Sequence, residues 1–308
     1  MMQPNVCAGL DMGGTGIRIV IMREERVLAS TTISTASFAD LAQRQRVSIL
    51  AQSILGLLPY GTRLIGVGIG ASGPVNVETG VIDNPYTLPA FSGFPLAAQM
   101  ETCLQVPVRM DNDATTAALG EHHFGAGIGS SRMLMVTLGT GVGVALLDRG
   151  KPFRMTNGSH PEAGHIAVSD DERVCYCGLT GCWESLAARS WLQTTLMERV
   201  PEVDYRRQRL VDWLEICRQS PEIASVFYQY GRQVGKGLGS LLMAYGPDTT
   251  VLSGSAASLY PLFEQGLQSV LQRAAGFEIN RDIHISLLGD TAGAMGATRL
   301  LPDATLLI

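Results

Sequence analysis

Apolar residues recur at every second position in three short segments of the chain. Ile17, Ile19 and Ile21 show this spacing, and residues 65–69 and 283–287 repeat it. A period of two is typical of a strand that buries one face. We therefore predict strands in these three segments.

Longer segments carry apolar residues at helical spacing. Residues 41–58, 191–200 and 226–242 follow a period of three to four residues and are predicted to be helices. The third helix contains glycine at positions 231, 235, 237 and 239, and each glycine costs about 1 kcal/mol of helix propensity. Close packing against a neighbouring helix or sheet is the expected compensation.

One arrangement of strands occurs twice. Residues 6–22 are predicted to form a strand, a glycine-rich turn and a second strand, and residues 133–147 show the same pattern. Two such hairpins, far apart in the chain, predict an α/β protein with two similar halves that face a cleft.

Composition narrows the class of protein. The 308 residues are 46% hydrophobic and 17% charged, with a formal net charge of −5. The apolar content excludes a disordered chain, and the negative balance argues against a basic protein that binds nucleic acid. The N-terminus lacks the basic start of a secretory signal, and no apolar run approaches the roughly 20 residues of a membrane span. We expect a cytoplasmic protein with reduced thiols that binds neither membrane nor nucleic acid.

The 35 glycines gather partly in the turns of the two hairpins. Glycine lets backbone N–H groups approach a polyphosphate closely, and a carboxylate at a strand end can face the accompanying metal. The candidates are Asp11, Gly13, Gly14 and Thr15 in the first turn and Thr140 and Gly141 in the second. Ordinary β-turns are the alternative for either turn alone. Neither turn has the spacing of a Walker A loop or a dinucleotide-binding fingerprint.

A polar cluster follows the apolar residues 106–108 and precedes a helix-like run. Asn112 and Asp113 occupy this junction between a strand and a helix. Capping of the helix is one interpretation. The other is that Asp113 acts as a general base for a substrate hydroxyl that attacks a phosphoryl group, with Asn112 binding a polyol.

Four residues have the composition of a structural zinc site. His165, Cys175, Cys177 and Cys182 form the pattern H-x9-C-x-C-x4-C. Three thiolates and one imidazole complete a tetrahedral zinc shell. Such a site would bring Glu162 near Glu184, beside the second ring nitrogen of His165, and these groups become candidate sugar ligands.

These motifs together resemble those of the ROK family (repressors, open reading frames, kinases). The resemblance rests on seven motifs in order along the chain: D-M-G-G-T-G-I-R at 11–18, G-A-S-G-P-V at 70–75, D-N-D-A at 111–114, L-G-T-G-V-G at 138–143, E-A-G-H at 162–165, C-Y-C-G-L-T-G-C-W-E at 175–184 and G-D-T-A-G-A-M-G-A at 289–297. It implies an α/β fold of two ribonuclease-H-like, actin-like ATPase domains around a central cleft. The implied domains are residues 1–115 joined by a C-terminal helix at 293–308, and residues 116–292 with the zinc knuckle.

The resemblance also implies an ATP-dependent kinase that transfers the γ-phosphoryl group to a hexose or N-acylhexosamine hydroxyl, usually the 6-OH. Asp113 would be the base, and the sugar would be held by Gly73, Asn84, Asn112, Asp113, Glu162, His165 and Glu184. ATP and Mg²⁺ would be bound by Asp11, Gly13, Gly14, Thr15, Thr140, Gly141 and Gly254. Structural Zn²⁺ would be bound by His165, Cys175, Cys177 and Cys182, and a homodimer is expected.

The segment around Gly254 reads L-S-G-S at 252–255, a departure from the family's usual glycine triplet near the adenosine. The motifs leave glucose, fructose, mannose, allose and N-acetylmannosamine open as substrates. A ROK-type sugar-sensing or transcriptional regulator without kinase activity is the alternative. We expect no DNA-binding domain, because the first phosphate turn comes as early as Asp11.

Overall fold

The computed structural model describes residues 3–201, 210–273 and 276–302 and forms two compact units. Unit 1 comprises Met1–Gly129, Ala145–Pro161 and Leu287–Ile308, and unit 2 comprises Ser130–Val144 and Glu162–Ser286. The expected boundary lay at residue 115, whereas residues 116–129 and 145–161 belong to the first unit.

Unit 1 is built on a mixed β-sheet. Within the described residues this sheet has the order β3-β2-β1-β4-β7, with antiparallel pairing along β1-β2-β3 and parallel pairing along β1-β4-β7. The strands are β1 (Asn5–Met12), β2 (Gly16–Arg23), β3 (Arg26–Ser34), β4 (Arg63–Ala71) and β7 (Val108–Asn112). The short strands β5 (Val75–Asn76) and β6 (Val81–Ile82) form a separate hairpin.

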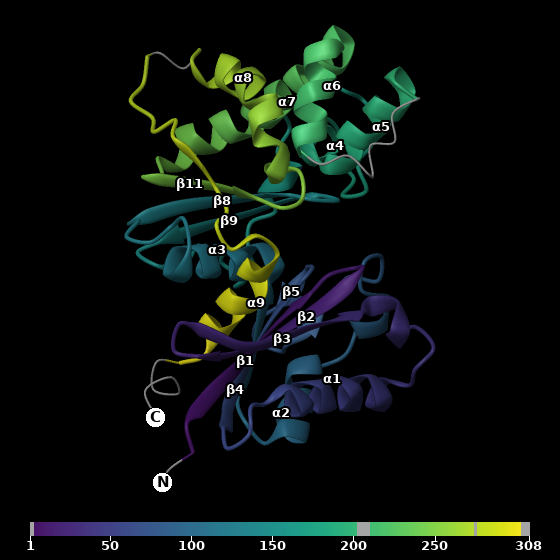
Figure 1. The fold of residues 1–308 in the computed structure, drawn as a ribbon, viewed down its shortest axis with the longest axis vertical. Coiled ribbons are helices and arrows are strands. Elements are labelled where there is room, and N and C mark those ends of the chain that lie inside the picture. The colour runs from purple at the N-terminus through teal and green to yellow at the C-terminus, as the bar shows by residue number, and fades with distance from the viewer. Residues whose placement is uncertain (1–2, 202–209, 274–275, 303–308) are drawn as a thin grey trace. The chain divides into compact units, whose positions relative to one another are not determined.

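The two faces of the sheet are covered by different helices. Ile17, Ile19 and Ile21 of β2 pack with residues of α1 (Gln43–Leu57) and α2 (Leu96–Leu104) in the larger core. Val20 and Met22 point to the opposite face, where they pack with Ala294 and Met295 of α9 (Ala292–Ala297). Figure 1 shows α1 and α2 on one side of this sheet and α9 on the other. The period-two pattern of the sequence is thus the alternation between these two cores.

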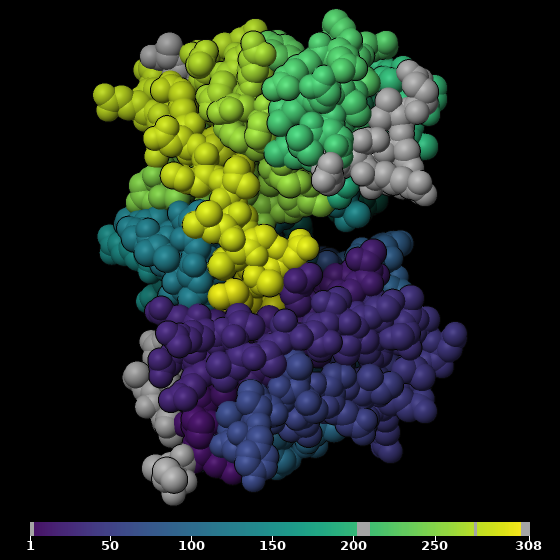
Figure 2. All heavy atoms as spheres, viewed as in Figure 1, coloured from purple at the N-terminus to yellow at the C-terminus, as the bar shows by residue number. Residues whose placement is uncertain are grey.

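Glycines let α9 lie directly on the sheet. A Cβ at Gly9 of β1 would be 1.9 Å from the carbonyl oxygen of Ala294, and one at Gly68 of β4 would be 1.7 Å from that of Ala297. In Figure 2 the yellow C-terminal segment lies against the purple N-terminal strands of unit 1. The expected C-terminal helix at 293–308 corresponds to α9 and the 3-10 turn Thr298–Leu300, and residues 303–308 lie outside the described part.

The helix α3 (Asp113–Phe124) belongs to unit 1 because it packs against α9. A Cβ at Gly296 would be 1.8 Å from the carbonyl oxygen of Thr116, and one at Gly120 would be 2.2 Å from that of Ala292. The backbones of the two helices therefore approach more closely than side chains would allow. This contact explains why the first unit extends beyond residue 115.

The second sheet has the order β10-β9-β8-β11-β12 within the described residues. Its strands are β8 (Arg132–Leu138), β9 (Val142–Asp148), β10 (Lys151–Pro152), β11 (Thr249–Ser253) and β12 (Ile283–Ile285). The helices of unit 2 are α4 (Glu184–Ala187), α5 (Arg189–Arg199), α6 (Leu210–Gln219), α7 (Pro221–Tyr245) and α8 (Tyr260–Leu271). Both predicted hairpins are present, as β1-β2 and as β8 followed by β9, and the prediction of an α/β fold is confirmed.

The glycines of α7 lie where other groups come close. A Cβ at Gly231 would be 2.0 Å from the carbonyl oxygen of Phe263 in α8, and one at Gly237 would be 2.1 Å from the ring of Trp183. The predicted packing role of these glycines is confirmed at both positions. In the part of the chain that the structure describes, no helix is both long enough and apolar enough to cross a membrane.

Candidate functional site

Asp113 stands at the first residue of α3, directly after β7. Its Oδ2 accepts a 2.8 Å hydrogen bond from the Ser72 hydroxyl, and its Oδ1 accepts one of 2.8 Å from the N–H of Ala114. Asn112, the residue before it, caps the helix by accepting from the N–H groups of Ala114 and Thr115. The cap and the candidate base are therefore adjacent residues with separate tasks. The half-buried Asp113 carboxylate is held in one orientation by two donors.

A buried ion pair lies beside this carboxylate. Asp111, which is 1% exposed, accepts hydrogen bonds through both carboxylate oxygens from the guanidinium group of Arg154. Arg154 also donates to the carbonyl oxygen of Gly158 at 3.4 Å. The segment 153–160 is thereby attached to the end of β7 from which α3 begins. Arg154 was missed in the sequence, where nothing links it to a residue 43 positions away.

Gly73 lies next to both Asn84 and Asn112 in unit 1. Asn84 donates through Nδ2 to the carbonyl oxygen of Gly73 at 2.8 Å and accepts through Oδ1 from the N–H of Thr87 at 2.9 Å. A Cβ at Gly73 would lie 2.9 Å from Nδ2 of Asn112 and 3.0 Å from Cε1 of buried His160. Glycine at position 73 therefore lets these two polar side chains approach the backbone.

Four residues at the β1-β2 hairpin were predicted to face phosphate and metal: Asp11 near the end of β1, and Gly13, Gly14 and Thr15 in the turn before β2. The N–H of Gly13 donates to the carbonyl oxygen of Gly16 at 3.0 Å, which closes the turn. A Cβ at Gly14 would lie 2.8 Å from Cγ2 of Thr87. Gly14 and Thr15 are exposed at the tip, so a ligand can reach their backbone.

Asp11 has little room and few cations around it. A Cβ at Gly293 would come within 2.7 Å of its Oδ2. Burial and the negative charge of Asp113 raise the pKa of Asp11 to about 7, and the charge of Asp290 acts in the same direction while Arg18 opposes it. Without a bound cation the Asp11 carboxyl group is difficult to ionise. A cation beside it would stabilise the ionised form, so this position could hold a divalent metal.

The second glycine turn, between β8 and β9, is attached to neighbouring segments of unit 2. The N–H of Arg189 donates to the carbonyl oxygen of Gly139 at 2.8 Å, and the Ser190 hydroxyl donates to that of Thr140 at 3.3 Å. A Cβ at Gly141 would lie only 2.3 Å from Oε2 of Glu184. That same oxygen accepts a 2.8 Å hydrogen bond from the N–H of Val142. The candidate sugar ligand Glu184 thus rests directly against the candidate phosphate turn.

Gly254 lies beside the same turn. Its φ of +81° is in the left-handed region that favours glycine, and a Cβ there would lie 2.6 Å from the carbonyl oxygen of Leu138. The N–H of Ala256 donates to that same carbonyl oxygen at 2.9 Å. The segment 252–255 departs from the family pattern but still forms a tight turn against the end of β8.

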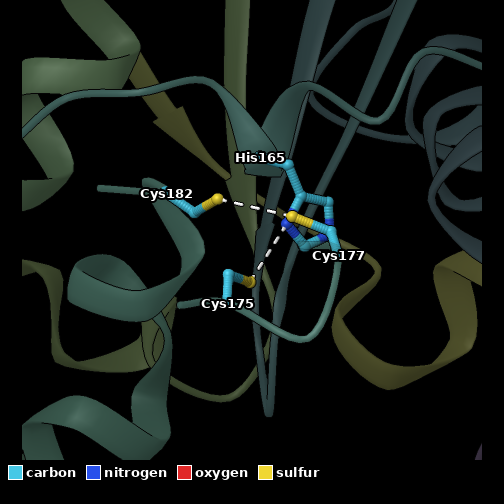
Figure 3. Close-up of side chains that lie close together, drawn as sticks. All are labelled: His165, Cys175, Cys177 and Cys182. Carbon is cyan, nitrogen blue, oxygen red and sulfur yellow. Dashed lines mark hydrogen bonds between the residues drawn. The ribbon is translucent and has the colours of Figure 1, made fainter. Parts of the chain in front are cut away.

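The four predicted metal ligands come together in unit 2. Their ligand atoms all lie within 4.8 Å of one another, and Figure 3 shows His165, Cys175, Cys177 and Cys182 converging on one point. Nδ1 of His165 is 3.6 Å from Sγ of Cys175, and the Sγ atoms of Cys177 and Cys182 are 3.6 Å apart. Tetrahedral Zn–S bonds of about 2.3 Å place two sulfur atoms about 3.8 Å apart, so the cluster fits such an ion.

Two glycines shape the loop that carries these cysteines. Gly178 and Gly181 have φ values of +90° and +66°, and a Cβ at Gly181 would lie 2.0 Å from the carbonyl oxygen of Ser169. The N–H of Gly178 donates to the carbonyl oxygen of Cys175 at 2.8 Å. The knuckle geometry therefore requires these glycines, as their spacing between the cysteines indicates.

Glu162 precedes a short 3-10 turn, Ala163–His165, and the N–H of His165, its last residue, donates to the carbonyl oxygen of Glu162 at 3.0 Å. The hydroxyl of Tyr176 lies 3.1 Å from Nε2 of His165. Partial burial and the charge of Glu184 raise the pKa of Tyr176 above its usual value, and Glu162 contributes in the same direction. Glu162, Glu184 and His165 thus all lie near Tyr176 in unit 2.

Three residues of the site, Ser72, Arg154 and Tyr176, were not predicted from the sequence. Ser72 lies inside the G-A-S-G-P-V motif and Tyr176 inside the C-Y-C motif, so motif membership was the available signal for both. Arg154 lies outside every motif considered.

The chain matches the sequence model of the ROK family over residues 7–304. A glucokinase of Halalkalibacterium halodurans is 30% identical, and the match covers 94% of this chain and 92% of the relative. The xylose repressor of Bacillus subtilis is 24% identical, with 80% of this chain and 62% of the repressor covered.

Solved structures agree. The ROK hexokinase of Thermus thermophilus superposes with a TM-score of 0.79 at 29% identity and covers 96% of this chain and 97% of its own. A ROK family glucokinase of Streptomyces griseus, in complex with glucose and AMPPNP, has a TM-score of 0.79 at 27% identity and covers 96% and 98%. The predicted fold class, an α/β fold of the actin-like ATPase type, is confirmed by these neighbours.

Proposed function

Because the chain belongs to the ROK family, we propose that it is an ATP-dependent sugar kinase that transfers the γ-phosphoryl group of ATP to a hydroxyl, the 6-OH, of a hexose or N-acylhexosamine. The observation that carries this proposal is the Asp113 carboxylate, fixed at the start of α3 by Ser72 and the N–H of Ala114. A sensor that only binds sugar has no need of an oriented base.

In this proposal Asp113 accepts the proton of the attacking sugar hydroxyl. Phosphoryl transfer depends on positioning and charge stabilisation more than on covalent chemistry, so a fixed acceptor within hydrogen-bond reach of the hydroxyl is the main requirement. The Ser72 hydroxyl donates a hydrogen bond to one carboxylate oxygen of Asp113 and so restricts rotation of the Asp113 side chain. Asn112, Gly73 and Asn84 bind the sugar from unit 1 in this assignment.

The two glycine turns bind the nucleotide. Gly13, Gly14 and Thr15 offer backbone and hydroxyl donors at the exposed tip of the first turn, and Thr140, Gly141 and Gly254 do so in unit 2. Asp11 would hold the Mg²⁺ ion that accompanies the nucleotide. When bound, Mg²⁺ neutralises charge on the phosphoryl oxygens of the nucleotide.

The cluster of His165, Cys175, Cys177 and Cys182 binds zinc, and the ion would act as a structural cross-link in unit 2. Zinc bound by Nδ1 of His165, the nitrogen that faces Sγ of Cys175, would leave Nε2 free of the metal. His165, Glu162 and Glu184 bind sugar hydroxyl groups, since carboxylates accept hydrogen bonds and the ring N–H donates one.

The test is an ADP-release assay with the purified protein, ATP and Mg²⁺ across glucose, fructose, mannose, allose and N-acetylmannosamine. Glucose is the first sugar to examine, because the relative of Halalkalibacterium halodurans is a glucokinase. We expect sugar-dependent ADP release that Asp113→Asn abolishes. No turnover with any sugar, in protein that binds both ATP and zinc, would overturn the proposal. Light scattering of the same sample tests the homodimer that the family resemblance implies.

The second candidate is a sugar-responsive regulator without kinase activity. The match to the xylose repressor of Bacillus subtilis supports it. Calorimetric binding of a sugar without ADP release, unchanged by Asp113→Asn, is the outcome that distinguishes this candidate from the kinase.

A further inference from the structure

Arg154 joins the end of β7 to the segment 153–160. Its guanidinium group donates to both carboxylate oxygens of Asp111, with 3.3 Å between Nη1 and Oδ1. Nη1 also donates to the carbonyl oxygen of Gly158 at 3.4 Å. All three residues lie in unit 1. One planar group therefore bonds a strand end and a loop at the same time.

On the side of β7 this contact continues into Asn112. Oδ1 of Asp111 accepts a hydrogen bond from Arg154 and also one of 2.8 Å from the N–H of Asn112. Asn112 uses its own Oδ1 to cap α3, so its Nδ2 group is the part of the amide that a sugar hydroxyl can meet. The direction of that group depends on the backbone to which Asp111 and Arg154 are bonded.

On the side of the loop the contact ends at Gly73. The N–H of Gly158 donates to the carbonyl oxygen of Met155 at 2.9 Å, and the φ of Gly158 is +81°, so the loop makes a tight turn. Two residues later, Cε1 of buried His160 lies 3.0 Å from the position of a Cβ at Gly73. Nδ2 of Asn112 lies 2.9 Å from the same position. The loop and the end of β7 thus meet around one glycine.

Stability alone does not explain two charges at this place. The side chains of Asp111 and Arg154 are 1% and 28% exposed, and well-packed apolar residues in place of a buried ion pair are often at least as stable. An arginine–carboxylate pair instead provides a planar contact at two points with a fixed geometry. Such a contact restricts the rotation of one segment against the other.

We infer that Arg154 is a positioning residue of the sugar site: its two-point ion pair with Asp111 fixes the Asn112 amide relative to the loop that follows Arg154. The inference rests on the proposed function, which places a sugar at Asn112 and Gly73. Arg154 acts through Asp111 and the backbone, and the inference gives it no contact with the sugar.

The variant Arg154→Lys tests this role in the full-length, zinc-loaded protein, with glucose or the best sugar of the panel as the probe. Lysine keeps the positive charge but replaces the planar fork by a point charge. The sugar KM should rise about 5- to 10-fold, as for a lost hydrogen bond, while the KM for ATP changes less than about 2-fold. The value of kcat should change less than about 3-fold, because Asp113 has its own donors in Ser72 and Ala114.

Asp111→Asn combined with Arg154→Met separates positioning from stability. This double variant leaves no unpaired charge of the pair, so its unfolding free energy should exceed that of Arg154→Met alone. Its sugar KM should nevertheless stay raised at least about 5-fold, because the two-point contact is absent. A sugar KM within about 2-fold of wild type, in either Arg154→Lys or the double variant, overturns the inference.

Arg109→Lys is the matched control. Arg109 lies on β7 as well and pairs with Glu101 at 3.7 Å, but these two side chains are 51% and 49% exposed. The control should leave the sugar KM unchanged. An equal increase in Arg109→Lys would overturn the inference, because the effect would then not depend on the pair with Asp111.

Calorimetric titration with the sugar alone, without ATP, separates this inference from the proposed function. If the wild-type protein binds a sugar but does not phosphorylate it, the proposed function fails. The sugar Kd of the same variants then decides the role of Arg154, with the same expected ratios to wild type. If the wild-type protein binds no sugar of the panel, the inference fails as well.

Discussion

The Ser72 hydroxyl donates a 2.8 Å hydrogen bond to Oδ2 of Asp113, from the turn after β4 to the first residue of α3. This bond holds the proposed base in place. Asp113→Asn should lower kcat at least 100-fold, as expected for loss of a general base, with sugar affinity within about 3-fold of wild type. Steady-state kinetics and calorimetry measure the two quantities. Retained turnover would remove Asp113 from the role of base.

Ser72→Ala should have a smaller effect of the same kind. Loss of one hydrogen bond to a carboxylate predicts a decrease in kcat of about 10-fold. Ser53→Ala is the control, because its hydroxyl donates to the carbonyl oxygen of Ile49 within α1. Equal kcat values for both variants would mean that Ser72 does not orient Asp113.

Asp11 predicts a pH dependence of stability. Its pKa in the folded protein is about 7, against 3.8 for the unperturbed group, so the folded chain keeps a proton that the unfolded chain has lost. Its contribution to stability is therefore fully present below about pH 4 and falls as the pH rises towards 7. At pH 8 the ionised carboxylate is unfavourable in the folded chain, so Asp11→Asn, which cannot ionise, should be more stable than wild type by on the order of 1 kcal/mol.

Urea denaturation at pH 5 and pH 8 without Mg²⁺ measures this difference. The advantage of Asp11→Asn should shrink at the lower pH. Asp40→Asn, which removes an exposed carboxylate, should show no comparable change between the two pH values. An advantage that grows as the pH falls would contradict the assignment.

Removal of the metal should weaken unit 2. Chelation of the wild-type protein should lower its Tm by at least about 5 °C, because a structural metal contributes its binding free energy to folding. Cys177→Ser should show a similar decrease and no further response to chelator. Cys103→Ser, at an exposed cysteine outside the cluster, is the control and should behave like wild type. Metal analysis that finds no zinc in the purified protein would refute the site.

Gly141→Ala should affect sugar binding through Glu184. The added methyl group would lie 2.3 Å from Oε2 of Glu184, which must move and lose its bond to the N–H of Val142. We expect the sugar KM to rise about 10-fold, the size of a lost charge-assisted hydrogen bond. Gly56→Ala, which meets nothing within 4 Å, should leave the KM unchanged. Equal sugar KM values in the two variants would separate Glu184 from the sugar site.

The pair of Asp111 and Arg154 predicts a non-additive effect on stability. Arg154→Met leaves a carboxylate that is 1% exposed without its cation and should cost about 3–5 kcal/mol of unfolding free energy. Asp111→Asn combined with Arg154→Met removes both charges and should cost less than Arg154→Met alone. Urea denaturation of the single and double variants gives the coupling energy, and a value near zero would contradict a direct pairing.

Much of the local structure was predictable from the sequence. The period-two segments are β2, β4 and β12, and the helical segments are α1, α5 and α7, because the regular alternation of side-chain directions in a strand or helix imposes its period on the sequence. The cysteine spacing predicted a cluster that the structure brings within 4.8 Å. These features depend on neighbours within a few residues or on a compact loop.

The remaining features depend on groups that are distant in the chain. Ser72 and Asp113 are 41 positions apart in the sequence, and Arg154 and Asp111 are 43 positions apart. The periodicity of the sequence does not predict either pairing. The assignment of α3 to unit 1 follows from its backbone contact with α9, where Gly296 approaches Thr116.

The sequence by itself thus determined several strands and helices, the α/β class and the Cys/His cluster, since each follows from local spacing. Only the tertiary structure decided which partners hold Asp113, Asp111 and His165. Hydrogen bonds and ion pairs between distant segments depend on where the folded chain places those segments, and local spacing does not encode that placement.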